Sequence, residues 1–282
     1  METLAPEPGA APPEAALRAD ARLRQALAAG GAVLIAYSGG VDSAYLAWSA
    51  CQVLGDRMLA LIADSPSLAR AHYRDALAFA TRHGIPCEAI QTAEMERPEY
   101  RRNGADRCFF CKDELFERME AELERRPRFA ALAYGANADD LWDYRPGAEA
   151  ARRHQVRAPL LEAGLGKAAI RTLARRAGLE VWDRPASPCL ASRIVHGITV
   201  TPALLSRVEQ GEEALRQMGF REFRARDHGD LVRIEIARAE LPRALSLEAA
   251  GELAAIFKGL GYRYVTLDLE GFRSGSLNPP QA

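Results

Sequence analysis

The sequence predicts an α/β protein, in which a Rossmann-like parallel sheet with helices on both faces precedes a small C-terminal α+β domain. From residue 31, short apolar runs alternate with longer amphipathic runs, the pattern of a parallel sheet that helices cover on both faces. After Gly197 the order changes to helix, hairpin, helix and strand. We therefore expect a flexible leader at residues 1–20, a first domain at residues 21–197 and a second at residues 198–282.

The elements of the first domain follow its apolar and amphipathic runs. Its strands are expected at residues 32–37, 58–63, 87–91 and 129–134. Its helices are expected at residues 43–54, 69–83 and 167–177, the last followed by Gly178, a usual helix stop.

The second domain opens with Thr201-Pro202, since proline favours the first turn of a helix, and Gly219 closes that helix. Its remaining elements are strands at residues 222–226 and 231–236 around a turn, a helix at 246–260 and a strand at 262–269.

Composition excludes several classes of protein. The 282 residues include 37 Lys plus Arg and 38 Asp plus Glu, with 48% hydrophobic and 27% charged residues, as in ordinary globular proteins. A net charge of −1 argues against a protein that coats nucleic acid. The Ala- and Pro-rich start lacks the features of a signal peptide, no apolar run reaches membrane-spanning length, and five cysteines are too few for a disulfide framework. We expect a cytoplasmic protein.

A glycine-rich segment, SGGVDS at residues 38–43, lies directly between an expected buried strand and a helix. The free N–H groups and the dipole of a helix start favour anions. Gly39 and Gly40 would let the backbone approach a phosphate, to which the hydroxyls of Ser38 and Ser43 can donate. Asp42 could align a divalent cation or fix the loop. The alternative is a plain strand-to-helix turn, which this specific motif disfavours.

SGGVDS resembles the pyrophosphate-binding loop of the ATP pyrophosphatase (PP-loop) superfamily, which includes GMP, NAD and argininosuccinate synthetases and tRNA-thiolating enzymes. The Walker motif GxxxxGK[ST] is absent. Enzymes of the superfamily cleave ATP between its α- and β-phosphates and adenylate a substrate oxygen, because AMP on that oxygen is a good leaving group.

Further segments narrow the resemblance to the LarE family of ATP-dependent sulfur transferases, which act in nickel-pincer cofactor synthesis. The resemblance extends from about Leu23 to about Asn278. It rests on ADSPSL (63–68), RCFFCKDELF (107–116), DDLWDYRPG (139–147), CLASR (189–193) and YVTLDLEGFRSGSLN (264–278).

The resemblance implies a substrate, pyridinium-3,5-biscarboxylic acid mononucleotide, whose carboxylate is adenylated with ATP and Mg²⁺ before a sulfur nucleophile displaces AMP. Asp42 is then a catalytic residue. Ser65 joins the nucleotide site, although an ST-turn before Pro66 explains it as well. The implied ATP-binding residues are Ser38, Gly39, Gly40, Val41, Asp42, Ser43 and Ser65.

Three cysteines are candidates for sulfur delivery. Cys108 and Cys111 form a Cys-x-x-Cys at the start of a helical run, and Cys189 follows much later. A redox disulfide, half of a zinc site and simple packing remain alternatives. Some LarE-family members give up the sulfur of a cysteine that corresponds to Pro188 here, whereas others carry three cysteines and a 4Fe-4S cluster. The resemblance therefore favours a cluster on Cys108, Cys111 and Cys189, the last being the catalytic cysteine.

Arginines of the second domain are candidates for binding the substrate's phosphate. Arg224 and Arg226 lie two positions apart on an expected strand, so they share a face and can grip a phosphate together. The resemblance adds Arg193, with Arg273 as a weaker candidate, and Glu235 could orient one of these arginines. A solvated strand face is the alternative.

Other polar residues are less informative. The aspartates of NADDLWDY (Asp139, Asp140 and Asp143) could line the active site or simply cap a helix. The five histidines show no metal-ligand spacing.

Two other functions compete with sulfur transfer to a mononucleotide. One is a tRNA-thiolating or amidotransferase-type synthetase, against which stand the net charge and the lack of an RNA-binding module or a glutaminase domain. The other is a non-catalytic nucleotide sensor, against which stands the intact motif. We expect a small-molecule mononucleotide partner, no nucleic-acid or membrane partner, and a homo-oligomer, while the sulfur source stays open.

Overall fold

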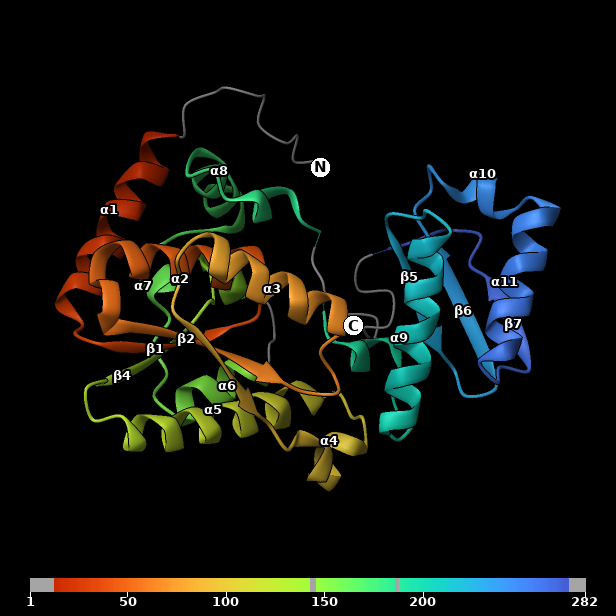
Figure 1. Ribbon diagram of the computed structural model, residues 1–282, viewed down its shortest axis with the longest axis horizontal. Helices are drawn as coiled ribbons and strands as arrows, with labels where there is room; N and C mark the ends of the chain where they lie inside the picture. The colour runs from red at the N-terminus through yellow and green to blue at the C-terminus, as the bar shows by residue number, and fades with distance from the viewer. Residues whose placement is uncertain (1–12, 143–145, 186–187, 274–282) are drawn as a thin grey trace. The chain divides into compact units, whose positions relative to one another are not determined.

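The computed structural model describes residues 13–142, 146–185 and 188–273 (Figure 1). The chain divides into two compact units. One comprises residues 1–65, 70–93 and 108–187, and the other comprises residues 66–69, 94–107 and 188–282. Among the described residues, no helix combines the length and apolarity that crossing a membrane requires.

A four-stranded parallel sheet in the order β3-β2-β1-β4 forms the centre of the first unit. This confirms the predicted α/β class. Its central strand β1 is buried along its whole length, as its continuous apolar sequence requires. The strands are β1 (Val33–Tyr37), β2 (Met58–Asp64), β3 (Cys87–Gln91) and β4 (Ala131–Tyr134).

Helices cover both faces of this sheet, with α2 and α3 on one side and α5 and α6 on the other (Figure 1). The helices of this unit are α1 (Glu14–Ala29), α2 (Val41–Leu54), α3 (Arg70–Arg82), α5 (Arg107–Arg125), α6 (Pro146–Arg153), α7 (Pro159–Glu162) and α8 (Lys167–Arg176). Helix α1 buries Ala16 and Ala19, so residues 14–20, which we expected in the leader, are helical. Residues 1–12 of the leader lie outside the described residues.

The order of the strands creates a switch in direction next to β1. The chain leaves β1 for β2 and β3 on one side and then crosses to β4 on the other. All four strands run parallel, so their carboxyl ends share one edge. In open α/β sheets, ligands bind at this edge, at the point where the strand order reverses.

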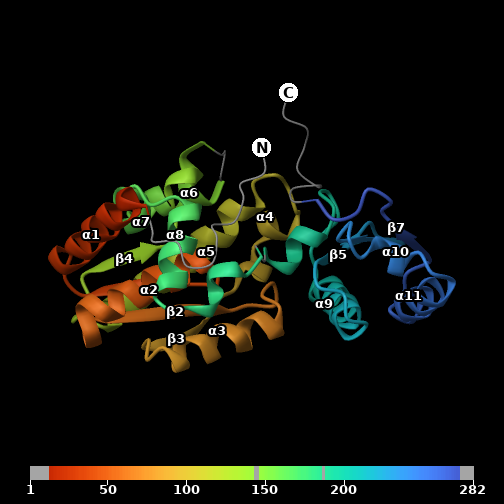
Figure 2. The same ribbon diagram turned by 90° about the horizontal axis from the view of Figure 1, so that it is seen from above.

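The second unit contains a three-stranded sheet in the order β5-β6-β7, with β5 antiparallel and β7 parallel to β6. This is the small α+β fold that the sequence predicts. Helix α9 lies alongside β5 (Figure 1, Figure 2). The elements are α4 (Pro98–Arg101), α9 (Pro202–Gln217), β5 (Phe223–Asp227), β6 (Leu231–Ile236), α10 (Leu241–Ala244), α11 (Leu247–Gly259) and β7 (Tyr264–Leu267).

Residues 188–197, which we expected in the first domain, belong to the second unit. The side chain of Asn103 holds them there, because its Nδ2 donates to the carbonyls of Val195 at 2.9 Å and Ile198 at 3.0 Å. Arg107 also donates to the carbonyl of Ala191 at 3.0 Å. A segment distant in sequence thus fixes the position of this stretch, which no local pattern could reveal.

Candidate active site

The SGGVDS segment forms the turn from β1 into α2 and the first residues of α2. Gly40 lies at the N-cap position of α2 with extended backbone. The hydroxyl of Ser43 accepts the N–H of Ser38 and donates to the carbonyl of Gly40, both at 3.1 Å. These bonds hold the loop against the first turn of α2, whose exposed N–H groups and dipole favour an anion.

Two glycines allow close backbone approach at this loop. Gly39 has a φ of 75°, and a Cβ there would lie 2.6 Å from the Cβ of Ala76. Gly135 follows β4, and a Cβ there would lie 2.8 Å from the backbone nitrogen of Ser43. A Cβ on Gly40 would lie 3.6 Å from Ser38 Oγ, an ordinary contact distance. Gly39 and Gly135 therefore fix the shape of the loop, whereas Gly40 leaves space beside it.

An ion pair stands at the start of α2. The Nζ of Lys167, the first residue of α8, lies 2.5 Å from Oδ2 of Asp42. Oδ1 of Asp42 is buried and has no hydrogen-bond partner among the described residues. Asp139 accepts the backbone N–H of Lys167 at 2.7 Å and so caps α8. A cation and an unsatisfied carboxylate oxygen thus lie beside the anion-binding loop.

The NADD segment holds its own loop in shape. Asp140 accepts the backbone N–H of Asn137 at 3.0 Å, and the side chain of Asn137 accepts the N–H of Asp139 at 2.9 Å. Asp140 therefore stabilises the loop after β4, and Asp139 caps a helix that begins at Lys167. Asp143 lies outside the described residues.

Ser65 follows β2, at the same sheet edge as the loop, and is buried. Arg70 donates to its carbonyl at 2.6 Å and pairs with Asp64 at 2.5 Å. The hydrogen bond from Arg70 lowers the pKa of Asp64.

Lys112, on α5, lies 6.0 Å from the ring centre of Tyr134, the last residue of β4.

The three candidate cysteines occupy helix starts. Cys108 and Cys111 lie in the first turns of α5, where i and i+3 positions share a face; Cys108 is exposed and Cys111 half-buried. Cys189, also half-buried, is the N-cap residue of the short 3-10 helix η5 (Leu190–Arg193) in the second unit. Burial raises the pKa of the other two cysteine thiols, Cys51 and Cys87, the latter to about 11.

The candidate arginines of the second unit form a charged cluster with two buried glutamates. Arg193 pairs with Glu212 of α9 through both carboxylate oxygens, at 2.9 and 3.0 Å. Arg226 pairs with Glu235, with its Nε at 3.0 Å from Oε2. Glu235 also accepts from Arg233 at 3.0 Å. Glu235 therefore orients Arg226, one of the roles that the sequence left open.

Arg224 is the half-buried member of this cluster. Burial, together with the positive charges of Arg193 and Arg226, lowers its pKa to about 10. Its guanidinium lies 4.9 Å from the ring centre of Phe272. Arg273 is more exposed and pairs with Glu270 at 2.7 Å. Arg224 thus lies near two other arginines, each of which is paired with a buried glutamate.

Known proteins resemble this chain over most of its length. The NAD synthase family profile matches residues 19–141. An uncharacterized protein of Synechocystis sp. is 43% identical over 250 residues, 87% of this chain and 91% of that protein. The pyridinium-3,5-bisthiocarboxylic acid mononucleotide synthase of Lactiplantibacillus plantarum is 32% identical over 247 residues, 87% of this chain and 88% of that enzyme. The chain belongs to the LarE family. An uncharacterized protein of Methanocaldococcus jannaschii is 26% identical over 242 residues, 86% of this chain and 91% of that protein.

Membership in the LarE family, together with the NAD synthase match across the loop, implies an ATP-using enzyme. Within the first unit, the structure brings the SGGVDS loop and Ser65 to one sheet edge. Within the second, it brings Cys189 near Arg193 and links Arg226 to the same segment. Sequence reasoning missed Lys167, Gly135 and Glu212. Lys167 at a helix start and Glu212 within a polar stretch carry no local signal beyond their charge.

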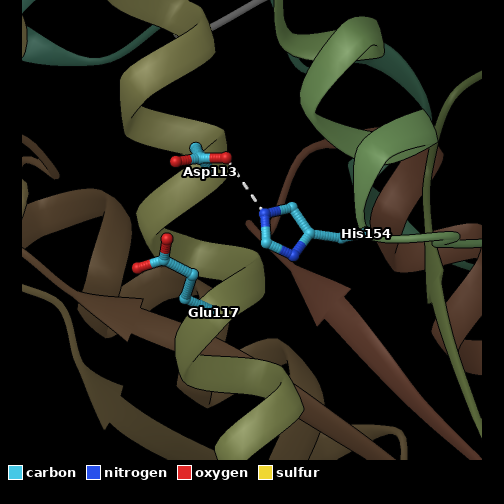
Figure 3. A group of neighbouring side chains, drawn as sticks. All are labelled: Asp113, Glu117 and His154. Carbon is cyan, nitrogen blue, oxygen red and sulfur yellow. Dashed lines mark hydrogen bonds and ion pairs between the residues drawn. The ribbon is translucent and has the colours of Figure 1, made fainter.

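One further cluster of this LarE-family chain contains a histidine and two acidic residues from α5 and the end of α6 (Figure 3). The ligand atoms of Asp113, Glu117 and His154 lie within 4.8 Å of one another. Nε2 of His154 lies 3.0 Å from Asp113, and Nδ1 lies 3.0 Å from Glu120. Arg153 also pairs with Asp113 at 3.2 Å. With a carboxylate at each ring nitrogen, the imidazole is placed as a cation that joins two helices rather than as a metal ligand.

Proposed function

We propose that this protein is an ATP-dependent sulfur transferase that adenylates a carboxylate of pyridinium-3,5-biscarboxylic acid mononucleotide and converts it to a thiocarboxylate. The observation that carries the proposal is the SGGVDS loop at the switch point of the sheet, closed by Ser43 and flanked by Asp42 and Lys167. The named relative from L. plantarum, which makes the bisthiocarboxylic acid mononucleotide, supplies the substrate class.

ATP would bind with its β- and γ-phosphates on the loop. The hydroxyl of Ser38 and the N–H groups at the start of α2 would donate to phosphate oxygens, while Ser43, whose hydroxyl donates to the carbonyl of Gly40, keeps the loop in shape. Lys167 adds positive charge where pyrophosphate departs, and Ser65 lies at the neighbouring strand end. Attack of the substrate carboxylate oxygen on the α-phosphorus forms the acyl adenylate and breaks the bond to pyrophosphate.

Asp42 fits a role in holding Mg²⁺. Carboxylate oxygens are the ligands that Mg²⁺ prefers, and Oδ1 of Asp42 is a buried oxygen with no hydrogen-bond partner in the described part of the chain. When bound, the ion would neutralise charge on the phosphates. Lys167 holds the other oxygen of Asp42 and so orients the carboxylate.

The phosphate of the mononucleotide would bind to the arginine cluster of the second unit. Arg224 is the first candidate, because a bound phosphate would offset both the burial and the repulsion from Arg193 and Arg226 that lower its pKa. Arg226 adds charge from the same strand, held by Glu235, and Arg273 is a peripheral candidate.

Sulfur would be delivered through Cys189, with Cys108 and Cys111. The chemistry of the donor set fits a 4Fe-4S cluster: three thiols, two of them one turn apart at the start of α5. When bound, such a cluster would supply the sulfide that acts as the nucleophile. Cys108, Cys111 and Cys189 would hold the cluster, and attack of the sulfur on the acyl carbon would break its bond to AMP, which leaves.

Pyrophosphate release tests the adenylation step. The purified protein with ATP and Mg²⁺ should release pyrophosphate when pyridinium-3,5-biscarboxylic acid mononucleotide is added, and little without it. Nicotinic acid mononucleotide, with one carboxylate, serves as a matched control for the second carboxylate. Release that does not depend on any added acceptor would contradict the proposal.

A further inference from the structure

The segment that carries Cys189 is held by a single buried arginine. Arg193 is 1% exposed. Its Nη1 donates to the carbonyl of Pro188 at 2.5 Å, to that of Cys189 at 3.1 Å and to the hydroxyl of Ser192 at 3.1 Å. One guanidinium nitrogen therefore contacts two successive carbonyls, one of them the cysteine's own.

Other donors fix the same backbone from both sides of the cysteine. Ser192 donates to the Cys189 carbonyl through its hydroxyl at 2.7 Å and through its N–H at 3.0 Å. The N–H of Leu190 donates to the carbonyl of Ser67 at 2.8 Å. The peptide groups on either side of the half-buried thiol are thus both hydrogen-bonded, so the direction of the Cys189 side chain is restricted.

The opposite side of Arg193 joins this segment to the strand of candidate phosphate-binding arginines. The carboxylate of Glu212 accepts hydrogen bonds from Nε and Nη2 of Arg193. It also accepts the N–H of Ala225 at 3.3 Å. Ala225 lies between Arg224 and Arg226, and Arg226 donates to the carbonyl of Ser192 at 3.2 Å. The cysteine segment and β5 are therefore linked through fully buried groups.

We infer that Arg193 is a positioning residue, which fixes Cys189 relative to β5 for sulfur transfer, rather than a ligand of the substrate's phosphate. This inference rests on the proposed function. A guanidinium suits the task because its planar fork can bind a carboxylate on one side and carbonyls on the other, which a lysine ammonium cannot do in the same geometry. Misplacement of a reacting group by about 1 Å can cost about a hundredfold in rate.

The test compares Arg193→Lys with Arg207→Lys. Arg207 is a matched control: it lies on α9, pairs with buried Asp227 at 2.6 Å, and donates to the carbonyl of Gly229 rather than to the Cys189 segment. Each variant keeps the positive charge at its position but loses the planar guanidinium that donates two hydrogen bonds side by side. Three quantities are measured for each variant. They are the thiocarboxylate formed per pyrophosphate released, the KM for the mononucleotide in pyrophosphate release, and the rate of Cys189 alkylation by iodoacetamide. The alkylation rate is followed by peptide mass spectrometry, with Cys51 as the internal reference.

For Arg193→Lys, we expect thiocarboxylate per pyrophosphate to fall about tenfold or more, with the mononucleotide KM within about twofold of wild type. Cys189 should be alkylated faster relative to Cys51, since its segment is released. Arg207→Lys should leave all three quantities unchanged. A raised mononucleotide KM with normal transfer would assign Arg193 to the phosphate and overturn the inference, as would no change in transfer or alkylation.

Two further outcomes keep this inference separate from the proposed function. If wild type releases no mononucleotide-dependent pyrophosphate, the proposed function fails, and the alkylation comparison still decides whether Arg193 holds Cys189. If Arg193→Lys does not fold, Ser192→Ala replaces it, because it removes a smaller part of the same contact set. Faster alkylation of Cys189 is then expected, and an unchanged rate overturns the inference.

Discussion

At the residue scale, Gly39 and Gly40 look alike in the sequence but differ in the structure. Gly39 has a left-handed φ and no room for a Cβ, whereas Gly40 has ordinary φ and space. An alanine in the left-handed region costs about 1–2 kcal/mol before any clash is counted. A substitution at Gly39 therefore tests how the loop folds, whereas one at Gly40 tests how the loop binds phosphate.

Gly39→Ala should lower the free energy of unfolding by about 2 kcal/mol or more, measured by urea denaturation, because strain adds to the contact with Ala76. Gly40→Ala should unfold like wild type but raise the KM for ATP in pyrophosphate release, since its methyl group occupies space beside the loop. Equal stability of the two variants would show that the loop geometry is not as described.

Arg224→Ala should weaken binding of the mononucleotide by about 1.5–3 kcal/mol, the usual loss for a hydrogen bond to a charged group. Burial and the neighbouring arginines lower the pKa of Arg224 to about 10, and a phosphate bound beside it would offset both effects. The KM for ATP should stay constant. Arg216→Ala, which removes a surface pair on α9, is the control. A raised KM for ATP with unchanged binding of the mononucleotide would show that Arg224 serves ATP, and would contradict this prediction.

At the element scale, the imidazole of His154 connects α5 to the end of α6. Burial lowers the pKa of His154, but the hydrogen bonds that its ring donates to the carboxylates of Asp113 and Glu120 outweigh that effect and raise the pKa overall. The folded protein therefore binds the proton more tightly than the unfolded chain does. The stabilisation is fully present below the unfolded pKa of about 6.5 and is lost as the pH rises through the raised value.

The destabilisation caused by His154→Gln should thus be larger at pH 6 than at pH 9, by about 0.5 kcal/mol, a size that allows for solvent screening. His83→Gln is a matched control, for which the pH dependence of the destabilisation should have the opposite sign. Burial, with the charge of Arg82, lowers the pKa of His83, so its protonation opposes folding as the pH falls. Urea denaturation at the two pH values measures both. Slopes of the same sign for both variants would contradict the assignment.

Most helices and strands could be predicted from the sequence, because their apolar spacing is local. The strands β1, β2 and β4 match continuous apolar runs, and Thr201-Pro202 begins α9 as expected. The Lys167–Asp42 pair could not be predicted, since the two residues are 125 positions apart and meet through the topology of the sheet. The same holds for Glu212 with Arg193. The loop motif was readable because its six residues act as one local unit.

At the scale of the whole molecule, the cysteines decide how sulfur is supplied. Anaerobically purified wild type should be brown with about four irons per chain if the three thiols bind a cluster. Cys108→Ala should lose both the iron and sulfur transfer, whereas Cys51→Ala, a half-buried control on α2, should keep both. An iron-free wild type in which Cys189 becomes dehydroalanine after one turnover would mean that the cysteine itself gives up its sulfur.

Cys189→Ala adds a check that is independent of the sulfur source. The variant should release mononucleotide-dependent pyrophosphate, because the ATP loop belongs to the other unit, yet form no thiocarboxylate. Thiocarboxylate formed at the wild-type rate would remove Cys189 from the mechanism.

The central claim, replacement of a carboxylate oxygen by sulfur at the expense of ATP, is tested most directly by the mass of the product. The anaerobic protein is incubated with ATP, Mg²⁺, sulfide and pyridinium-3,5-biscarboxylic acid mononucleotide, and the mononucleotide is analysed by mass spectrometry. We expect a product heavier by the difference between one sulfur and one oxygen, formed together with AMP and pyrophosphate and absent without ATP. A mononucleotide of unchanged mass, despite pyrophosphate release, would contradict the account.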